Sequence, residues 1–252
     1  MNATKEWLSK WEVKRDKLSS PVDYNEYYSA SSIYNREIDI LNIGYCSIPS
    51  GEILVRDPLC FLASPHEKPY FQTVPKGEFL VELCVVKPTM GECARYATAR
   101  IRFTGAEAVR FEEALIGYED LDDLGEDDYY GFNVDAGLAC ICDKTVHRAY
   151  CDFYEKWYIE HENDKGNIYL DYFADLFEKS YKISPKYQCS GGDWINWKIP
   201  ETDYHMPIFR SGFGDGTYPV YWGYDKDGSI CQMIVEFIDI RLAYEEEEKG
   251  NG

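Results

Sequence analysis

Two short turns that pair an aspartate with glycine are the sequence's most promising chemical features. Asp135-Ala136-Gly137 interrupts one apolar, strand-like run, and Gly214-Asp215-Gly216 interrupts another. Aspartate in such turns accepts hydrogen bonds from nearby backbone N–H groups, while glycine adopts a left-handed conformation. A structural role is therefore the leading interpretation. If the fold brings the two turns together, their carboxylates would also line a cleft that binds a cation or a polar ligand.

Three aromatic residues follow the second turn and complete the candidate ligand site. Aromatic rings contact cations and cover polar ligands, but they also anchor sheets in a core. The candidate ligand-binding residues are Asp135, Gly137, Asp215, Gly216, Tyr218, Tyr221 and Trp222.

Cysteine and histidine offer two other kinds of chemistry, and neither has convincing spacing. The segment from Cys140 to Cys151 supplies three thiols and His147, but it lacks the C-x2-C pair common in zinc sites. Cys189 lies in a Gly-rich context with His205 as the nearest base in sequence, yet no spacing joins them in space. We therefore predict no metal and no cofactor, and we assign no catalytic residue.

The charge of the chain restricts its expected partners. The 252 residues include 45 acids and 26 bases, which gives a formal net charge of −19 at pH 7. Such an excess repels phosphate backbones and anionic bilayers over a Debye length of about 10 Å. Nucleic acid and membranes are therefore not expected partners. Three interpretations of the charge stay open: a basic protein partner, whose opposite charge would steer association, a bound cation, and a solvated surface that only maintains solubility. The last is the leading one, because runs of acids are usually solvated. The oligomeric state also stays open.

The N-terminus and the cysteines indicate a compartment. Residues 1–7 lack the basic and apolar regions of a signal peptide, and no apolar run reaches the roughly 18 residues of a membrane span. Nine cysteines is an odd number, so without an export signal we expect free thiols. The predicted location is the cytoplasm.

The apolar pattern places both turns in a domain made mainly of antiparallel strands. Strand-like runs are separated by turns rich in Gly, Asp and Pro. These runs are residues 53–55, 79–86, 99–103, 109–116, 130–134, 138–142, 206–210, 218–224 and 230–240.

Two helices interrupt the strands. Asp143 is a suitable N-cap for the first, in which apolar residues recur at helical spacing as far as Trp157. The second presents an aromatic stripe from Tyr169 to Phe177. We expect both stripes to pack against the sheet rather than to bind a ligand.

The predicted fold class is α+β. It has an antiparallel, mainly β sheet or sandwich core with two packed helices and a helical N-terminal extension. The predicted divisions are a helical extension over residues 1–44, a single α+β domain over 45–244 and an acidic tail over 245–252.

Short motifs spread along the predicted domain carry a resemblance to a known family. They are Ser50-Gly51-Glu52-Ile53, Asp57-Pro58, Val74-Pro75-Lys76-Gly77, Val81-Glu82-Leu83, Ala99-x-Ile101-x-Phe103, Gly131 to Gly137 and Gly214 to Gly223. On these motifs the chain resembles a largely bacterial family known only as a domain of unknown function (the four-two-four-one family). The resemblance covers about residues 45–240. It implies the extent of the fold and transfers no activity.

Two hypotheses about function remain open. The first is an acidic binding protein, such as an immunity or inhibitor protein that covers a basic toxin or another protein partner. The net charge, the many aromatic residues and the missing catalytic constellation favour it. The second is an enzyme or small-ligand binder that uses Asp135 and Asp215 in one cleft. The first is preferred, and binding is favoured over catalysis.

Overall fold

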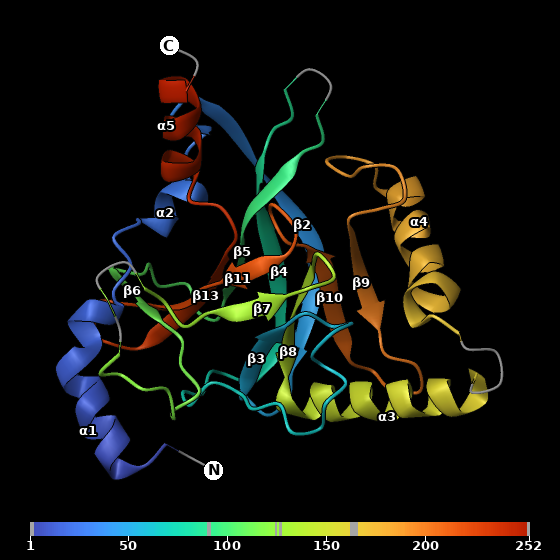
Figure 1. The fold of residues 1–252 in the computed structure, drawn as a ribbon, viewed down its shortest axis with the longest axis horizontal. Helices are drawn as coiled ribbons and strands as arrows, with labels where there is room; N and C mark the ends of the chain where they lie inside the picture. Colours follow the sequence, from blue (N-terminus) through green and yellow to red (C-terminus); the bar gives the residue numbers. More distant parts are fainter. Residues whose placement is uncertain (1–2, 90–91, 124, 126–127, 162–165, 251–252) are drawn as a thin grey trace.

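Two antiparallel sheets packed face to face form the centre of the molecule (Figure 1). The computed structural model describes residues 3–89, 92–123, 125, 128–161 and 166–250. Within that part of the chain, no helix is both long and apolar enough to cross a membrane. The predicted α+β class with an antiparallel core is confirmed.

The larger sheet has seven strands, and every neighbouring pair in it is antiparallel. Its long central strands are buried along most of their length, and exposed residues occur only at the strand ends. In spatial order the strands are β1 (Ser32–Ile33), β2 (Arg36–Ile48), β4 (Gly77–Val86), β5 (Arg95–Arg102), β13 (Ile230–Glu236), β12 (Val220–Tyr224) and β6 (Arg110–Glu113).

The smaller sheet has four strands, and a two-stranded ribbon lies beside it in the fold. Strand β2 of the larger sheet contacts three of the four strands, which shows that the two sheets pack together. The four strands are β3 (Ile53–Arg56), β8 (Leu138–Asp143), β10 (His205–Arg210) and β9 (Trp194–Lys198), and the ribbon pairs β11 (Gly216–Tyr218) with β7 (Phe132–Val134).

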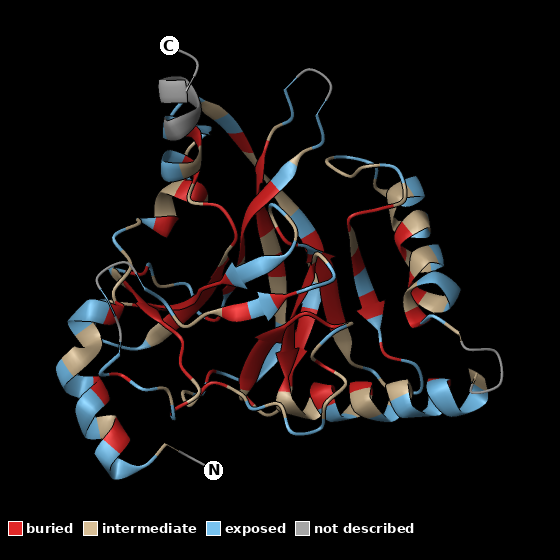
Figure 2. Cartoon of the chain, viewed as in Figure 1, coloured by how far each residue is buried: buried red, intermediate tan, exposed pale blue. Residues whose placement is uncertain are grey.

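The four-stranded sheet is buried on both faces, as the side chains of β8 show. Ala139 and Ile141 belong to the core between the sheets, whereas Cys140 and Cys142 belong to a second core beneath two helices. These helices are α3 (Lys144–His161) and α4 (Ala174–Ile183), the latter preceded by a π-helical turn, η2 (Tyr169–Phe173). Figure 2 shows the buried strands β3, β8 and β10 above α3, and the exposed residues towards the C-terminal end of α3.

The cap predicted for the first helix is confirmed. Asp143 is fully buried, and its Oδ1 accepts a hydrogen bond from the backbone nitrogen of Thr145 at 2.7 Å. Its other oxygen accepts from the backbone of Ser50 and Gly51. Because one carboxylate serves the helix start and the turn before β3, it joins the helical layer to the sheet.

The helical N-terminal extension predicted for residues 1–44 is confirmed only in its first part. Helix α1 (Lys5–Lys14), the 3₁₀ turn η1 (Arg15–Leu18) and the short helix α2 (Tyr24–Tyr27) are helical. The expectation of helix up to residue 44 is wrong, because β2 runs from Arg36 and pairs with β4 along its length. That pairing buries Ile38 and Ile43, which a solvent-facing extension would leave exposed.

The C-terminal segment continues as helix rather than leaving the domain at once. Helix α5 (Ile240–Gly250) begins with Ile240, which is fully buried in the main core. The predicted acidic tail, residues 245–252, therefore overlaps this helix as far as residue 250. Residues 251 and 252 lie outside the described residues.

Candidate functional site

The first aspartate turn joins β7 to β8 and is held by a buried carboxylate. Gly137 has a φ of +64°, the left-handed conformation that was predicted for it. The backbone nitrogens of Asp135 and Ala136 both donate to Oδ2 of Asp57, at 3.0 and 2.6 Å. The side chain of Asp135 is exposed at the tip of this turn.

Asp57 was not predicted as a site residue, although Asp57-Pro58 is one of the resemblance motifs. It is fully buried, and its Oδ1 accepts from the backbone nitrogens of Leu59 and Cys60. One carboxylate thus satisfies four backbone N–H groups from two distant segments. Asp57 therefore positions the turn that presents Asp135.

The second aspartate turn joins β10 to β11 and docks on the first. Oδ1 of Asp215 accepts a hydrogen bond from the backbone nitrogen of Gly137 at 3.0 Å. The backbone nitrogen of Ser211 donates to the carbonyl oxygen of Gly137, also at 3.0 Å. Gly214 has a φ of +100°, which only glycine adopts readily. The two turns are therefore adjacent.

A cavity of about 450 Å³ lies where the two turns meet. Asp135, Gly137 and Asp215 from the predicted set all line it. Arg95 and Arg210 line it as well, and sequence reasoning missed both. The cavity therefore carries two carboxylates and two guanidinium groups, a mixed-charge lining that the sequence did not suggest.

The other predicted site residues do not line this cavity. Gly216 begins β11, and the hydroxyl of Tyr218 donates to the carbonyl oxygen of Gly214 at 2.8 Å, so both support the second turn. Tyr221 and Trp222 lie in the main core, where they are 9% and 0% exposed. Neither residue lines this cavity, because both side chains belong to the packed core around β12.

The arginine side of the cavity rests on a buried ion pair. Nε of Arg210 lies 2.9 Å from Oδ1 of Asp193, whose side chain is only 4% exposed. Burial raises the pKa of Asp193, while the backbone N–H of Cys189 and the charge of Arg210 act in the opposite direction. Arg95 donates to the carbonyl oxygen of Gly212 at 3.3 Å.

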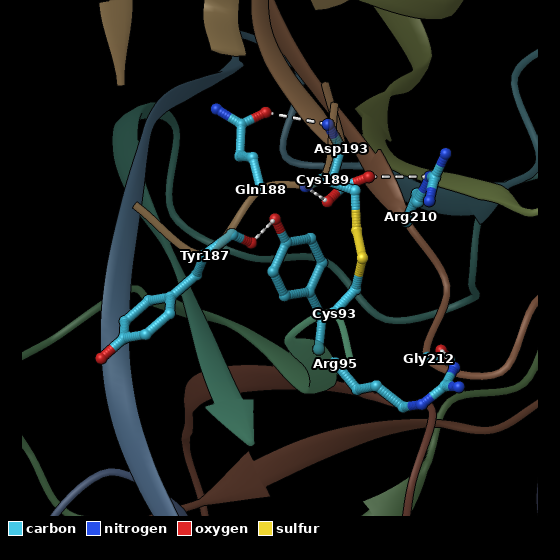
Figure 3. Close-up of a disulfide and its surroundings, with 9 residues drawn as sticks. Cys93, Arg95, Tyr187, Gln188, Cys189, Asp193, Arg210 and Gly212 are labelled. Atoms are coloured by element: carbon cyan, nitrogen blue, oxygen red, sulfur yellow. Dashed lines mark hydrogen bonds and ion pairs between the residues drawn. A yellow bond between two sulfur atoms is a disulfide. The ribbon is translucent and has the colours of Figure 1, made fainter. Parts of the chain in front are cut away.

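A disulfide joins the segment that carries Arg95 to the segment that carries Asp193. The expectation that all nine cysteines are free thiols is wrong, because Cys93 and Cys189 are bonded (Figure 3). Cys93 lies between β4 and β5, and Cys189 lies between α4 and β9. The two are 96 residues apart, and only the packing of these connections brings them together. The other seven cysteines are free.

The two alternative chemistries weighed on the sequence were a zinc site over Cys140 to Cys151 and a nucleophilic Cys189. Cys189 is bonded to Cys93 and is therefore not a free thiol. Cys140 and Cys142 point into the same apolar core, which raises the pKa of both thiols. Sγ of Cys151 lies 3.3 Å from Nε2 of His147, but burial raises the pKa of Cys151 to about 11. Such a thiol is protonated at neutral pH and is a poor nucleophile. Within the described ranges, no three His, Cys, Asp or Glu residues form a potential metal site.

One signal in the sequence could have indicated the arginines. Arg210 ends a predicted strand directly before the Gly-rich turn at Gly214, which places a cation beside Asp215. Arg95 gives no comparable signal, since it reaches the cavity from a different sheet.

Comparisons with known proteins bear on the family alone. Searches of curated proteins and of solved structures found no match. A family model described as "Protein of unknown function (DUF4241)" matches residues 46–235, a span that contains both aspartate turns, Asp57 and both arginines. This span exceeds half of the 252 residues. The chain therefore belongs to the DUF4241 family of proteins of unknown function.

Proposed function

We propose that the protein binds a small polar ligand in the cavity between the Asp135 and Asp215 turns. One observation carries this proposal: two turns distant in sequence are hydrogen-bonded to each other, and Asp135 and Asp215 line the same cavity of about 450 Å³. A volume of this order suits a small molecule. The turns are held by backbone hydrogen bonds, so little ordering of the protein is needed on binding.

Binding fits the lining of this cavity better than catalysis does. Among the described residues that line it there is no histidine and no cysteine. Its one serine, Ser211, donates its hydroxyl to the carbonyl oxygen of Gly214 at 2.7 Å. A nucleophilic serine instead needs a base within hydrogen-bond reach.

The test is a screen of a small polar-molecule library by ligand-observed NMR on the full chain. Each hit is then measured with the double variant Asp135→Asn/Asp215→Asn. We expect affinity to fall at least tenfold, about 1.4 kcal/mol, because the carboxylate charges are lost. The melting temperature should change little, because the amide oxygen introduced by Asp215→Asn can still accept the hydrogen bond from Gly137.

Asp225→Asn provides the matched control. Asp225 also accepts backbone hydrogen bonds in an Asp/Gly turn, from Asp227 and Ser229, but it does not line the cavity. Hits should bind this variant as they bind the wild type. Equal losses in both variants, or hits indifferent to the double variant, would contradict the proposal.

A second candidate function is an acidic binding protein for a basic protein partner, such as an immunity or inhibitor protein. It is supported by the net charge of −19 and by a groove of about 580 Å³ beside α3. Aromatic and acidic side chains line this groove together, and such a surface suits a lysine or arginine side chain. They include Phe153, Trp157, Asp152, Glu160, Asp171 and Glu201. The proposed setting is the cytoplasm, as predicted from the sequence. The seven free thiols fit its reducing conditions, whereas the Cys93–Cys189 disulfide is of a kind uncommon there.

This second function is tested with a fluorescent hexalysine peptide at low salt and by pull-down from the native host. The charge reversal Glu160→Lys should weaken peptide binding more than Glu12→Lys, an exposed acid on α1. Equal effects of the two reversals would indicate nonspecific attraction and argue against a groove. A captured host protein supports the proposal only if salt releases it.

A further inference from the structure

We infer that the ligand of this cavity is a zwitterion, a small molecule that carries one ammonium group and one acidic group. The inference rests on the proposed function and adds the chemical class of the ligand. It comes from the juxtaposition of two aspartates and two arginines around one cavity.

The two aspartates have free capacity for an ammonium group. Within the described part of the chain, the carboxylate of Asp135 has no hydrogen-bond or ion-pair partner. Asp215 uses Oδ1 for the backbone nitrogen of Gly137 and leaves Oδ2 open. An ammonium group offers three donors, so one such group can engage both carboxylates.

The two arginines have free capacity for an acidic group. Arg210 uses Nε for Asp193, and its side chain is 52% exposed, so its terminal nitrogens are accessible. The guanidinium of Arg95 lies over the ring of Phe213, 4.9 Å from the centroid, and one terminal nitrogen contacts Gly212. A guanidinium presents its donors in a planar fork that matches a carboxylate or phosphate.

The charge balance selects a zwitterion over a simple ion. Two carboxylates and two guanidinium groups give the lining a negative side and a positive side. Because the buried Asp193 offsets the charge of Arg210, Arg95 supplies the uncompensated positive charge. A simple cation would be repelled by the guanidinium groups, and a polyphosphate would be repelled by the carboxylates. A molecule with one charge of each sign satisfies both ends.

The disulfide holds the arginine end in place. Cys93 precedes Arg95 by two residues at the start of β5. The backbone nitrogen of Cys189 donates to Oδ2 of Asp193, and Oδ1 of the same carboxylate pairs with Arg210. Figure 3 shows the bonded sulfurs between these two arginines. The covalent bond therefore links the segment that carries Arg95 to the segment whose Asp193 pairs with Arg210.

Apolar side chains form the remaining wall. Phe177 is 1% exposed and Leu138 is 6% exposed, and both contribute to the lining together with Tyr169. Such a wall would contact the hydrocarbon part of the ligand, while its two charged ends meet the aspartates and the arginines. An amino acid has this combination of groups.

The test measures binding of the twenty common L-amino acids to the oxidised full chain by ligand-observed NMR and calorimetry. At least one should bind. Its N-acetyl and its amide derivatives, which each lack one charge, should bind at least tenfold more weakly. Arg95→Gln should weaken the amino acid at least tenfold but leave the amide derivative nearly unchanged.

Arg102→Gln is the matched control for Arg95→Gln. Arg102 lies at the other end of β5, is exposed, and also donates to a backbone carbonyl, that of Gly105. It should not affect binding. Absence of binding by every amino acid, or equal binding of the blocked derivatives, would overturn the inference. If singly charged molecules bind and are lost in Asp135→Asn/Asp215→Asn, the zwitterion inference fails while the proposed function stands.

Discussion

Oδ1 of Asp215 lies 3.0 Å from the backbone nitrogen of Gly137, so one hydrogen bond joins two turns that are 78 residues apart. The structural and the functional interpretations of these turns are therefore compatible. Asp215 uses one oxygen to hold the first turn, and its second oxygen remains available at the cavity. Asp135 contributes a carboxylate that the turn itself does not use.

The stability of the Asp135 turn should depend on Asp57. Asp57→Ala leaves four buried or partly buried N–H groups without their acceptor, so we expect unfolding to become easier by at least about 3 kcal/mol. Urea unfolding measures the change. Asp135→Ala, at an exposed carboxylate with no partner among the described residues, should cost no more than about 0.5 kcal/mol. Similar losses of unfolding free energy in both variants would contradict the positioning role of Asp57.

Stability should fall as the pH rises through the range in which Glu113 titrates. Burial raises the pKa of Glu113 from 4.5 to about 7, and the residue is only 3% exposed. The folded state therefore gains its full stabilisation from protonated Glu113 below pH 4.5. This stabilisation is lost as the pH rises through about 7. The slope for one proton is about 1.4 kcal/mol per pH unit.

Glu113→Gln should reduce the slope of this part of the stability curve by the share of one proton. Glu236, whose pKa burial also raises to about 7, retains its own share. The amide oxygen can still accept from the backbone nitrogens of Tyr130 and Gly131, so the fold is retained. Urea titrations at several values between about pH 4.5 and 8 measure the slope. The exposed Glu107→Gln serves as control and should leave it unchanged. A Glu113→Gln slope equal to that of the wild type would contradict the raised pKa.

Breaking the disulfide should lower stability. Cys93 and Cys189 close a loop over a sequence separation of 96. A cross-link of that length lowers the entropy of the unfolded chain and so raises the free energy of unfolding by about 2–4 kcal/mol. The double variant Cys93→Ser/Cys189→Ser should therefore unfold at lower urea than the oxidised protein. Cys60→Ser, at an exposed free thiol, should not. Peptide mapping without reductant should recover the Cys93–Cys189 pair, and its absence from oxidised protein would contradict the bond.

Two adjacent glycines should respond differently to alanine. Gly191 and Gly192 have φ values of +95° and +91°, so alanine strains the backbone at both, by about 1 kcal/mol. A Cβ at Gly191 meets nothing within 4 Å, whereas one at Gly192 would clash with the carbonyl oxygen of Phe177. We expect Gly192→Ala to cost about 1–3 kcal/mol more than Gly191→Ala in unfolding free energy. Equal costs would show that the backbone of Phe177 moves away freely.

The sequence by itself predicted the elements that local patterns control. Alternating apolar residues indicated the antiparallel strands, and helical spacing after Asp143 indicated α3 and its cap. Aspartate and glycine indicated the two turns, because their side-chain and backbone preferences act over a few residues. The assignment of residues 36–44 to a helical extension is wrong, because only pairing with β4 shows that they form a central strand.

Tertiary structure alone decided which of these features meet. The pairing of Asp215 with Gly137, the disulfide between Cys93 and Cys189 and the entry of Arg95 into the cavity each join segments far apart in the chain. Local spacing carries no information about such contacts, since they depend on how two sheets pack. For the same reason Tyr221 and Trp222, beside Asp215 in sequence, lie in the core instead of the cavity. The sequence determined the chemistry available in the two turns, and the packing of the sheets determined the two arginines that face them.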